Sequence, residues 1–221
     1  MDRIAEETGT NRSTGESIYN QLRDSGEIPK GGRGVHALRI SSAHAAKYLI
    51  AICCAEHVKD AANAVRRYAV LEEAGYGFRD NQGHVPLPGI TWESISDNFP
   101  RLAKLPSSHT FFEALVAIID SYIDAPERDE TVTVTFGGPF PWAKASVSLA
   151  NRGVALQYNA PKIQDDEGHS DDDDEFLATI DPSKERQRRR FAKLGGDLRL
   201  TTEVTHRTLS ALGDLLRGET A

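Results

Sequence analysis

The sequence is poor in cysteine, with two among 221 residues, and these two are neighbours, Cys53 and Cys54. Adjacent cysteines cannot close a useful loop, which excludes a disulfide-built scaffold and favours their burial on a helix. Long apolar runs are also lacking. The longest, from Tyr48 to Ala55, spans eight residues, whereas a helix that crosses a bilayer needs about 20. No apolar signal segment follows Met1, and we expect a cytoplasmic protein.

Motifs for catalysis and metal binding are scarce as well. The seven histidines, at positions 36, 44, 57, 84, 109, 169 and 206, show neither an HExxH pattern nor a paired Cys/His spacing for zinc. The glycines of residues 31–34 follow a lysine instead of preceding one, which excludes a P-loop, and the sequence has no Gly-x-Ser-x-Gly elbow. We therefore expect no metal, no cofactor and no enzymatic activity.

Charge is present but unevenly distributed. The net charge of −7 argues against a protein that coats nucleic acid nonspecifically. Residues 165–175 hold eight carboxylates, whereas residues 184–193 hold six bases and one acid. The basic run fits either a solvated helix face or an auxiliary phosphate-binding arm that the carboxylates shield when DNA is absent. In the second interpretation, its phosphate contacts are Arg186, Arg188, Arg189 and Arg190.

The first forty residues show the pattern of a helix-turn-helix. A short helix opens at Ile4 and stops at Gly9, a residue that tolerates the positive φ of the turn. Ser13 is expected to cap the second helix, over residues 14–25, with Glu16 completing a capping box and glycine at position 26 ending the helix. Three apolar residues have the spacing to fix the crossing angle of the two helices: Ile4, Ile18 and Leu22.

A basic, glycine-rich stretch follows this second helix. Residues 27–30 and 35–40 are predicted as two short strands around the glycines, and together they would form a β-ribbon wing. Polar side chains of the turn and the second helix could reach base edges or phosphates. They are Thr10, Asn11, Arg12, Ser13, Thr14, Ser17, Asn20 and Arg23. The wing would add phosphate contacts from Lys30, Arg33 and Arg39.

Two segments carry a family likeness: Ile4-Ala-Glu-Glu-Thr-Gly9 and Leu22-Arg-Asp-Ser-Gly-Glu-Ile-Pro-Lys30. Through them, residues 3–40 resemble the winged helix-turn-helix modules of bacterial and phage regulators, including DNA-binding proteins of phages, prophages and gene transfer agents of proteobacteria. The resemblance implies a DNA-binding module in under a fifth of the chain. Because only Met1 precedes Asp2, we expect the first helix of a three-helix core to be absent. We expect the apolar helix after Ser41 to support the module instead.

Farther along the chain, the pattern predicts helices first and strands later. An apolar helix begins near Ser41 or Ser42, a second covers residues 57–73, and a third follows a capping box at Thr110–Glu113. Strict alternation of apolar residues predicts a three-stranded antiparallel meander, over residues 131–136, 143–149 and 154–158. A last strand and an amphipathic helix are predicted at residues 197–204 and 205–217.

Together these elements predict an α+β fold. It consists of an N-terminal (winged) helix-turn-helix, a helical middle, and a C-terminal antiparallel β-meander with a terminal helix. The predicted segments are a winged helix-turn-helix at 1–40, a helical core or oligomerisation region at 41–125, a β-meander at 126–161, an acidic disordered linker at 162–180, and a basic segment, strand and helix at 181–221.

The function predicted from the sequence is sequence-specific binding of double-stranded DNA by a transcription regulator of phage or mobile-element genes. Two alternatives stay open: a DNA-recognition subunit for phage packaging, as in small terminases, and a non-enzymatic protein–protein adaptor. The adaptor would use the aromatic corner at residues 137–142, which fits a tight, buried turn equally well. We expect a homodimer or a protein partner from the transcription machinery, and no contact with a membrane.

Overall fold

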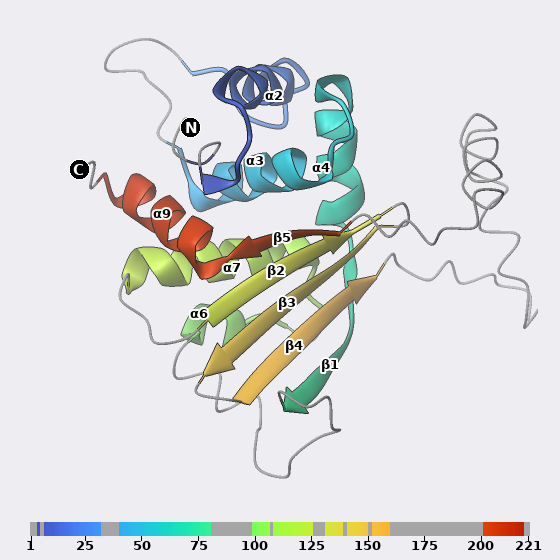
Figure 1. Ribbon diagram of the computed structural model, residues 1–221, viewed down its shortest axis with the longest axis vertical. Helices are drawn as coiled ribbons and strands as arrows, with labels where there is room; N and C mark the ends of the chain where they lie inside the picture. Colours follow the sequence, from blue (N-terminus) through green and yellow to red (C-terminus); the bar gives the residue numbers. More distant parts are fainter. Residues whose placement is uncertain are drawn as a thin grey trace, which may run out of the picture.

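The computed structural model describes residues 4, 7–31, 40–80, 99–106, 108–125, 131–138, 141–149, 152–159 and 201–218. These residues form helices and one antiparallel sheet, which confirms the α+β class. In Figure 1, α3 (Ser42–Cys54) lies between the sheet and α2 (Arg12–Asp24). None of the described helices combines the length and the apolar character needed to cross a membrane.

The sheet has five strands in the order β1-β4-β3-β2-β5, each antiparallel to its neighbours. The strands are β1 (Glu72–Asp80), β2 (Thr131–Gly137), β3 (Trp142–Leu149), β4 (Arg152–Asn159) and β5 (Thr201–Thr205). Strands β2, β3 and β4 form the predicted meander. Alternation in β2 explains why: Val132, Val134 and Phe136 face the core, while the threonines between them stay partly or fully exposed.

Strand β1 corrects the expectation of a single helix over residues 57–73. The chain forms a short 3₁₀ turn, η2 (Val58–Asp60), then α4 (Ala61–Ala69), and it is already extended at Glu72. The fully buried Leu71 follows α4, and its carbonyl oxygen accepts a hydrogen bond from the Phe111 N–H at 2.8 Å. The backbone of β1 pairs with β4 instead of continuing the helix. This pairing is a tertiary effect that residue periodicity does not report.

The helical layer covers the apolar face of the sheet. It contains α3, α4, α6 (Pro100–Ala103), α7 (Phe111–Asp124) and α9 (His206–Arg217). Phe136 of β2 meets Tyr68 of α4 and Phe111 of α7 edge-on, with ring centroids 6.2 and 5.5 Å apart. The predicted capping box at the start of α7 is confirmed, since Thr110 and Glu113 exchange both hydrogen bonds. The layer is therefore held to the sheet by interlocked aromatic rings.

The adjacent cysteines lie at the C-terminal end of α3, as the sequence predicts. Both are free thiols and half-buried against the core. Burial raises the pKa of Cys53 to about 12. At that pKa almost no thiolate forms near neutral pH, so this sulfur behaves as a small apolar side chain.

Helices α7 and α9 approach each other closely at Gly213. A Cβ at this position would lie 2.8 Å from the Tyr122 carbonyl oxygen, and Gly213 is buried. Gly213→Ala is expected to lower the free energy of unfolding by about 1–2 kcal/mol, because overpacking pushes the helices apart. Urea denaturation checks this, with Ser210→Ala on the same helix as the control. Equal stability of the two variants would contradict the close approach.

Some predicted features lie outside the described residues. They are most of the wing with Arg33 and Arg39, the acidic linker at 162–180, and the basic run with Arg186, Arg188, Arg189 and Arg190. The side chains of Pro139, Phe140 and Trp142 in the aromatic corner also lie outside. The last predicted strand is present as β5 from Thr201 onward, and α9 follows it with Leu209 and Leu212 buried.

Candidate nucleic-acid interface

A glycine turn leads into α2. Ile4 and Glu7 are helical, the Thr8 N–H donates to the Ile4 carbonyl at 3.0 Å, and Gly9 follows with φ at +69°. This left-handed conformation strains any residue with a Cβ, which explains the glycine. Ile4 is 1% exposed, so the segment before the turn is anchored in the core.

The start of α2 corrects the predicted cap. Asn11, not Ser13, is the N-cap, and its Oδ1 accepts from the Ser13 N–H at 2.9 Å and the Ser13 hydroxyl at 2.8 Å. The helix therefore begins at Arg12, two residues earlier than expected. Asn and Ser are about equally good caps. Here the turn at Gly9 brings Asn11, the earlier of the two in the chain, to the cap position. Glu16 makes no capping box and instead bonds to Arg12.

The inner face of α2 packs on the helical layer. Its buried residues are Gly15, Ile18 and Leu22. The Tyr19 ring meets the Tyr48 ring of α3 edge-on at 6.1 Å, and the Arg23 guanidinium lies 5.7 Å above the Tyr19 ring. Helix α3 therefore packs against the inner face of α2, and α4 and η2 contact α2 as well.

The chain leaves α2 in a compact turn, and the predicted strand at residues 27–30 is wrong. Gly26 has φ at +78°, and the N–H groups of Glu27 and Ile28 both donate to the Leu22 carbonyl, at 2.9 and 3.1 Å. These bonds complete the helix C-cap and leave no ladder for a ribbon. Ile28 is fully buried, and Pro29 has no N–H to contribute.

Glu27 ties this turn to the helices below. Lys47 of α3 donates to its carboxylate at 3.1 Å and to its carbonyl at 3.0 Å, and Arg66 of α4 donates to the carboxylate at 2.8 Å. Burial raises the pKa of Glu27, but the hydrogen bonds and charges of Lys47 and Arg66 outweigh it and leave the pKa below its ordinary value. The C-terminal end of α2 is therefore clamped by charge to two helices.

The predicted DNA contacts lie mostly on the outward side of α2. The exposed ones are Asn11, Arg12, Ser13, Thr14, Ser17, Asn20 and Lys30. Thr10 and Arg23 are half-exposed at the two ends of the helix. Because residues 13, 16, 17 and 20 recur at helical spacing opposite the buried stripe, they form one surface, here called the outer face.

The outer-face residues and their neighbours differ in which hydrogen-bonding atoms they still have available for a ligand. The Asn11 oxygen already accepts two bonds, which makes this residue a cap. The Ser17 hydroxyl donates to the Ser13 carbonyl at 2.8 Å, yet it can still accept. No described residue bonds to the Asn20 amide, which keeps both its donor and its acceptor available.

Two acidic residues on this surface were absent from the predicted set. Glu16 lies 3.1 Å from Arg12, and Asp24 lies 3.1 Å from Lys30. The i,i+4 spacing of Arg12 and Glu16 was the sequence signal for the first pair. Both predicted cations are thus partly neutralised by carboxylates of α2 itself.

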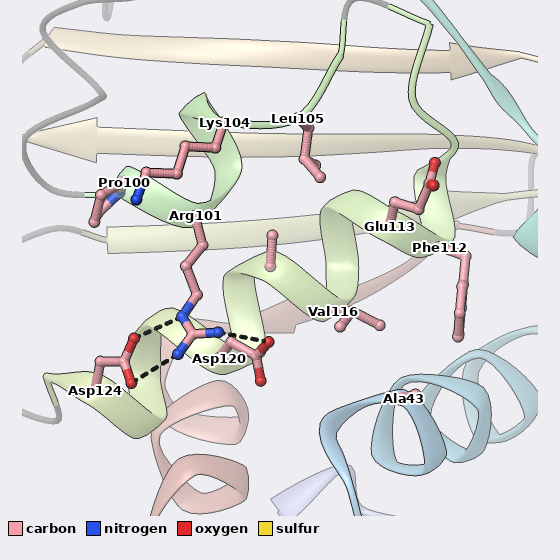
Figure 2. Close-up of a pocket in the computed structure, with 11 residues that line it drawn as sticks. Ala43, Pro100, Arg101, Lys104, Leu105, Phe112, Glu113, Val116, Asp120 and Asp124 are labelled. Carbon is pink, nitrogen blue, oxygen red and sulfur yellow. Dashed lines mark hydrogen bonds and ion pairs between the residues drawn. The ribbon is translucent and has the colours of Figure 1, made fainter.

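A separate groove of about 630 Å³ opens between α6 and α7, near the start of α3. Figure 2 shows Leu105 and Val116 on its apolar wall and Arg101 turned toward two carboxylates at one end. Arg101 holds Asp124 with two bonds, of 2.6 and 3.1 Å, and Asp120 with one of 3.3 Å. The two carboxylates neutralise the charge of the Arg101 guanidinium, so that charge is not available to a ligand in the groove.

A buried polar cluster lies elsewhere in the core. His109 is 2% exposed, and its two ring nitrogens lie 2.8 Å from the Tyr158 hydroxyl and from the Pro106 carbonyl oxygen. The Glu73 carboxylate is 3.4 Å from the same ring. Burial and the Glu73 charge raise the pKa of Tyr158, which keeps the phenol protonated. The cluster joins β1, β4 and the segment before α7, and its closure against solvent suits a structural link.

Metal-ligand groupings and relatives give no further guidance. Within the described ranges, no group of three or more His, Cys, Asp or Glu side chains is placed to hold a metal ion. No protein-family model matches the chain, and comparisons with curated proteins and with solved structures give no match either.

Proposed function

We propose that this protein binds double-stranded DNA sequence-specifically through α2 and regulates transcription of phage or mobile-element genes. The observation that carries the proposal is the two-sided character of α2. Its inner face is anchored by Ile18 and Leu22, while its outer face presents only polar and charged side chains to solvent. A rigidly held helix with such a surface is what base recognition in a DNA groove requires.

The dimensions agree with this role. Helix α2 has 13 residues, which at 1.5 Å per residue makes it about 20 Å long, and the major groove is about 12 Å wide and admits a helix. We infer that the helical segment at Ile4, the Gly9 turn and α2 form a helix-turn-helix. In that arrangement Thr10 and the N-terminus of α2 approach the phosphate backbone. Lys30 adds a phosphate contact, and Arg33 and Arg39 of the basic, glycine-rich stretch add two more.

The residues of the outer face and their neighbours are assigned distinct roles in recognition. Asn20 has the donor and acceptor that match adenine, and Arg12 has the donors that match guanine. Ser13, Thr14 and Ser17 can bond to either bases or phosphates. The Arg23 guanidinium lies over the Tyr19 ring near the end of the helix, and we assign it a contact to the DNA backbone. Asn11 contributes by fixing where α2 begins, and we assign it no base.

Two other functions share parts of this design. A packaging subunit of small-terminase type also combines a helix-turn-helix with oligomerising helices, and a non-enzymatic adaptor would use the groove or the aromatic corner without DNA. A regulator acts as a homodimer on a two-fold site, whereas a packaging subunit forms a ring. Light scattering of the full-length protein distinguishes a regulator from a packaging subunit, and DNA titration distinguishes both from an adaptor.

The proposal is tested by selecting bound oligonucleotides with the full-length protein and measuring affinity by fluorescence anisotropy at two salt concentrations. We expect affinity to fall steeply with salt. Asn20→Ala is expected to weaken binding to the selected site about 5- to 100-fold and to relax preference at one adenine. The control is Asn63→Ala on the exposed side of α4, which should change nothing. Salt-independent or absent DNA binding by the wild-type chain would overturn the proposal.

A further inference from the structure

We infer that Arg12 and Glu16 act together as a donor–acceptor unit that selects a G·C base pair in the DNA site. This inference rests on the proposed DNA-binding function and adds a base preference to it. Arg12 is the first residue of α2, and Glu16 follows one helical turn later on the outer face.

The contact between the two side chains is well placed but exposed. Arg12 Nε donates to Glu16 Oε1 at 3.1 Å, while the two side chains keep 71% and 55% of their surface in solvent. A pair this exposed contributes little to stability because water screens both charges. What the contact provides is placement: the carboxylate and the guanidinium lie side by side at the edge of the outer face.

A carboxylate on a DNA-reading helix needs a specific partner. Phosphates repel Glu16, so α2 enters the groove without loss only where the amino group of a base lies within reach of the carboxylate. In the major groove, cytosine presents its N4 amino group as a donor beside the O6 and N7 acceptors of its paired guanine. Arginine donors match those acceptors, and the carboxylate oxygen matches the amino group. A G·C pair therefore satisfies Arg12 and Glu16 at once.

The other base pairs satisfy the unit less well. An A·T pair offers the adenine amino group as a donor but lacks the two adjacent purine acceptors that a guanidinium prefers. A pair whose donor and acceptors lie in another order leaves the carboxylate without its partner and still exposed to the phosphates. Glu16 is thus expected to raise specificity chiefly by weakening binding to wrong sequences.

The test uses the full-length protein, its selected site, and variants of that site in which each G·C pair in turn is replaced by A·T. Wild type should lose about 10- to 100-fold in affinity at one G·C position. Glu16→Gln should reduce that penalty at least several-fold and bind random-sequence DNA more tightly than wild type. Arg12→Ala should remove the same preference, and the double variant should add nothing further.

Asp24→Asn is the matched control, because it removes one negative charge from the same helix, next to Lys30. It should tighten binding to random DNA while leaving the preference at that G·C position intact. If Glu16→Gln keeps the wild-type preference, or Asp24→Asn loses it too, the base preference does not come from Glu16 and the inference fails while DNA binding stands. If the wild-type chain shows no salt-dependent DNA affinity, the proposed function and the inference fail together.

Discussion

Replacing Leu22 by alanine is expected to lower the free energy of unfolding by about 2–5 kcal/mol, the range for leucines truncated in a packed core. Leu22 is fully buried, and it is one of only three buried residues of α2. Its loss leaves Ile18 as the only large buried anchor of the helix, since the third is a glycine. Helix α2 should therefore loosen more than the sheet does.

Urea denaturation followed by circular dichroism measures the global effect, and amide hydrogen exchange locates it. The control is Val70→Ala, which removes an aliphatic side chain that is 54% exposed and should cost little. DNA affinity should fall in Leu22→Ala even though no side chain of the outer face is changed. Unaltered protection of the α2 amides would contradict the assigned anchoring of this helix.

Replacing Glu27 by glutamine is expected to destabilise the protein by about 1.5–3 kcal/mol at neutral pH, the scale of a hydrogen bond to a charged group. The carboxylate is 14% exposed and accepts bonds from Lys47 and Arg66. Removing its charge leaves the half-buried Lys47 ammonium without its counter-ion. The clamp between the end of α2 and the two helices below would weaken.

The same substitution should have a defined pH dependence. The folded-state pKa of Glu27 lies below its ordinary value of 4.5, so its stabilisation is complete above that value and is lost as the pH falls through the folded pKa. The stability difference between wild type and Glu27→Gln should thus be full at pH 7 and shrink below about pH 4.5. Glu56→Gln, at an exposed site, is the control. A difference that stays constant with pH would rule out the assigned clamp.

Local patterns in the sequence predicted the elements whose hydrogen bonds and apolar faces are set by residues close together in the chain. The Thr110–Glu113 capping box places its bonds within four residues, and it is present in the structure. The alternation in β2 succeeds for the same reason, because one apolar face is enough to define a half-buried strand. The positive φ of Gly9 and Gly26 follows from the turns that a glycine favours.

Elements that depend on distant partners were missed or misplaced. Strand β1 is extended because its backbone pairs with β4, and no short-range pattern in its residues predicts that pairing. The short helix α6 was not predicted, and its Arg101 is held by carboxylates of α7. The supposed first strand of the wing is instead a capped turn, since buried Ile28 and the ion pairs of Glu27 draw it onto the helical layer.

The amino-acid sequence by itself determined the α+β class, the apolar stripes of the helices and strands, and the polar stretch that became the outer face. These depend on periodicity and capping, which act over a few residues. Only the tertiary structure decided how β1 joins the sheet and how Glu27 clamps the end of α2 to α3 and α4. Those outcomes depend on contacts between residues far apart in the chain, where packing and charge pairing select among locally equal alternatives.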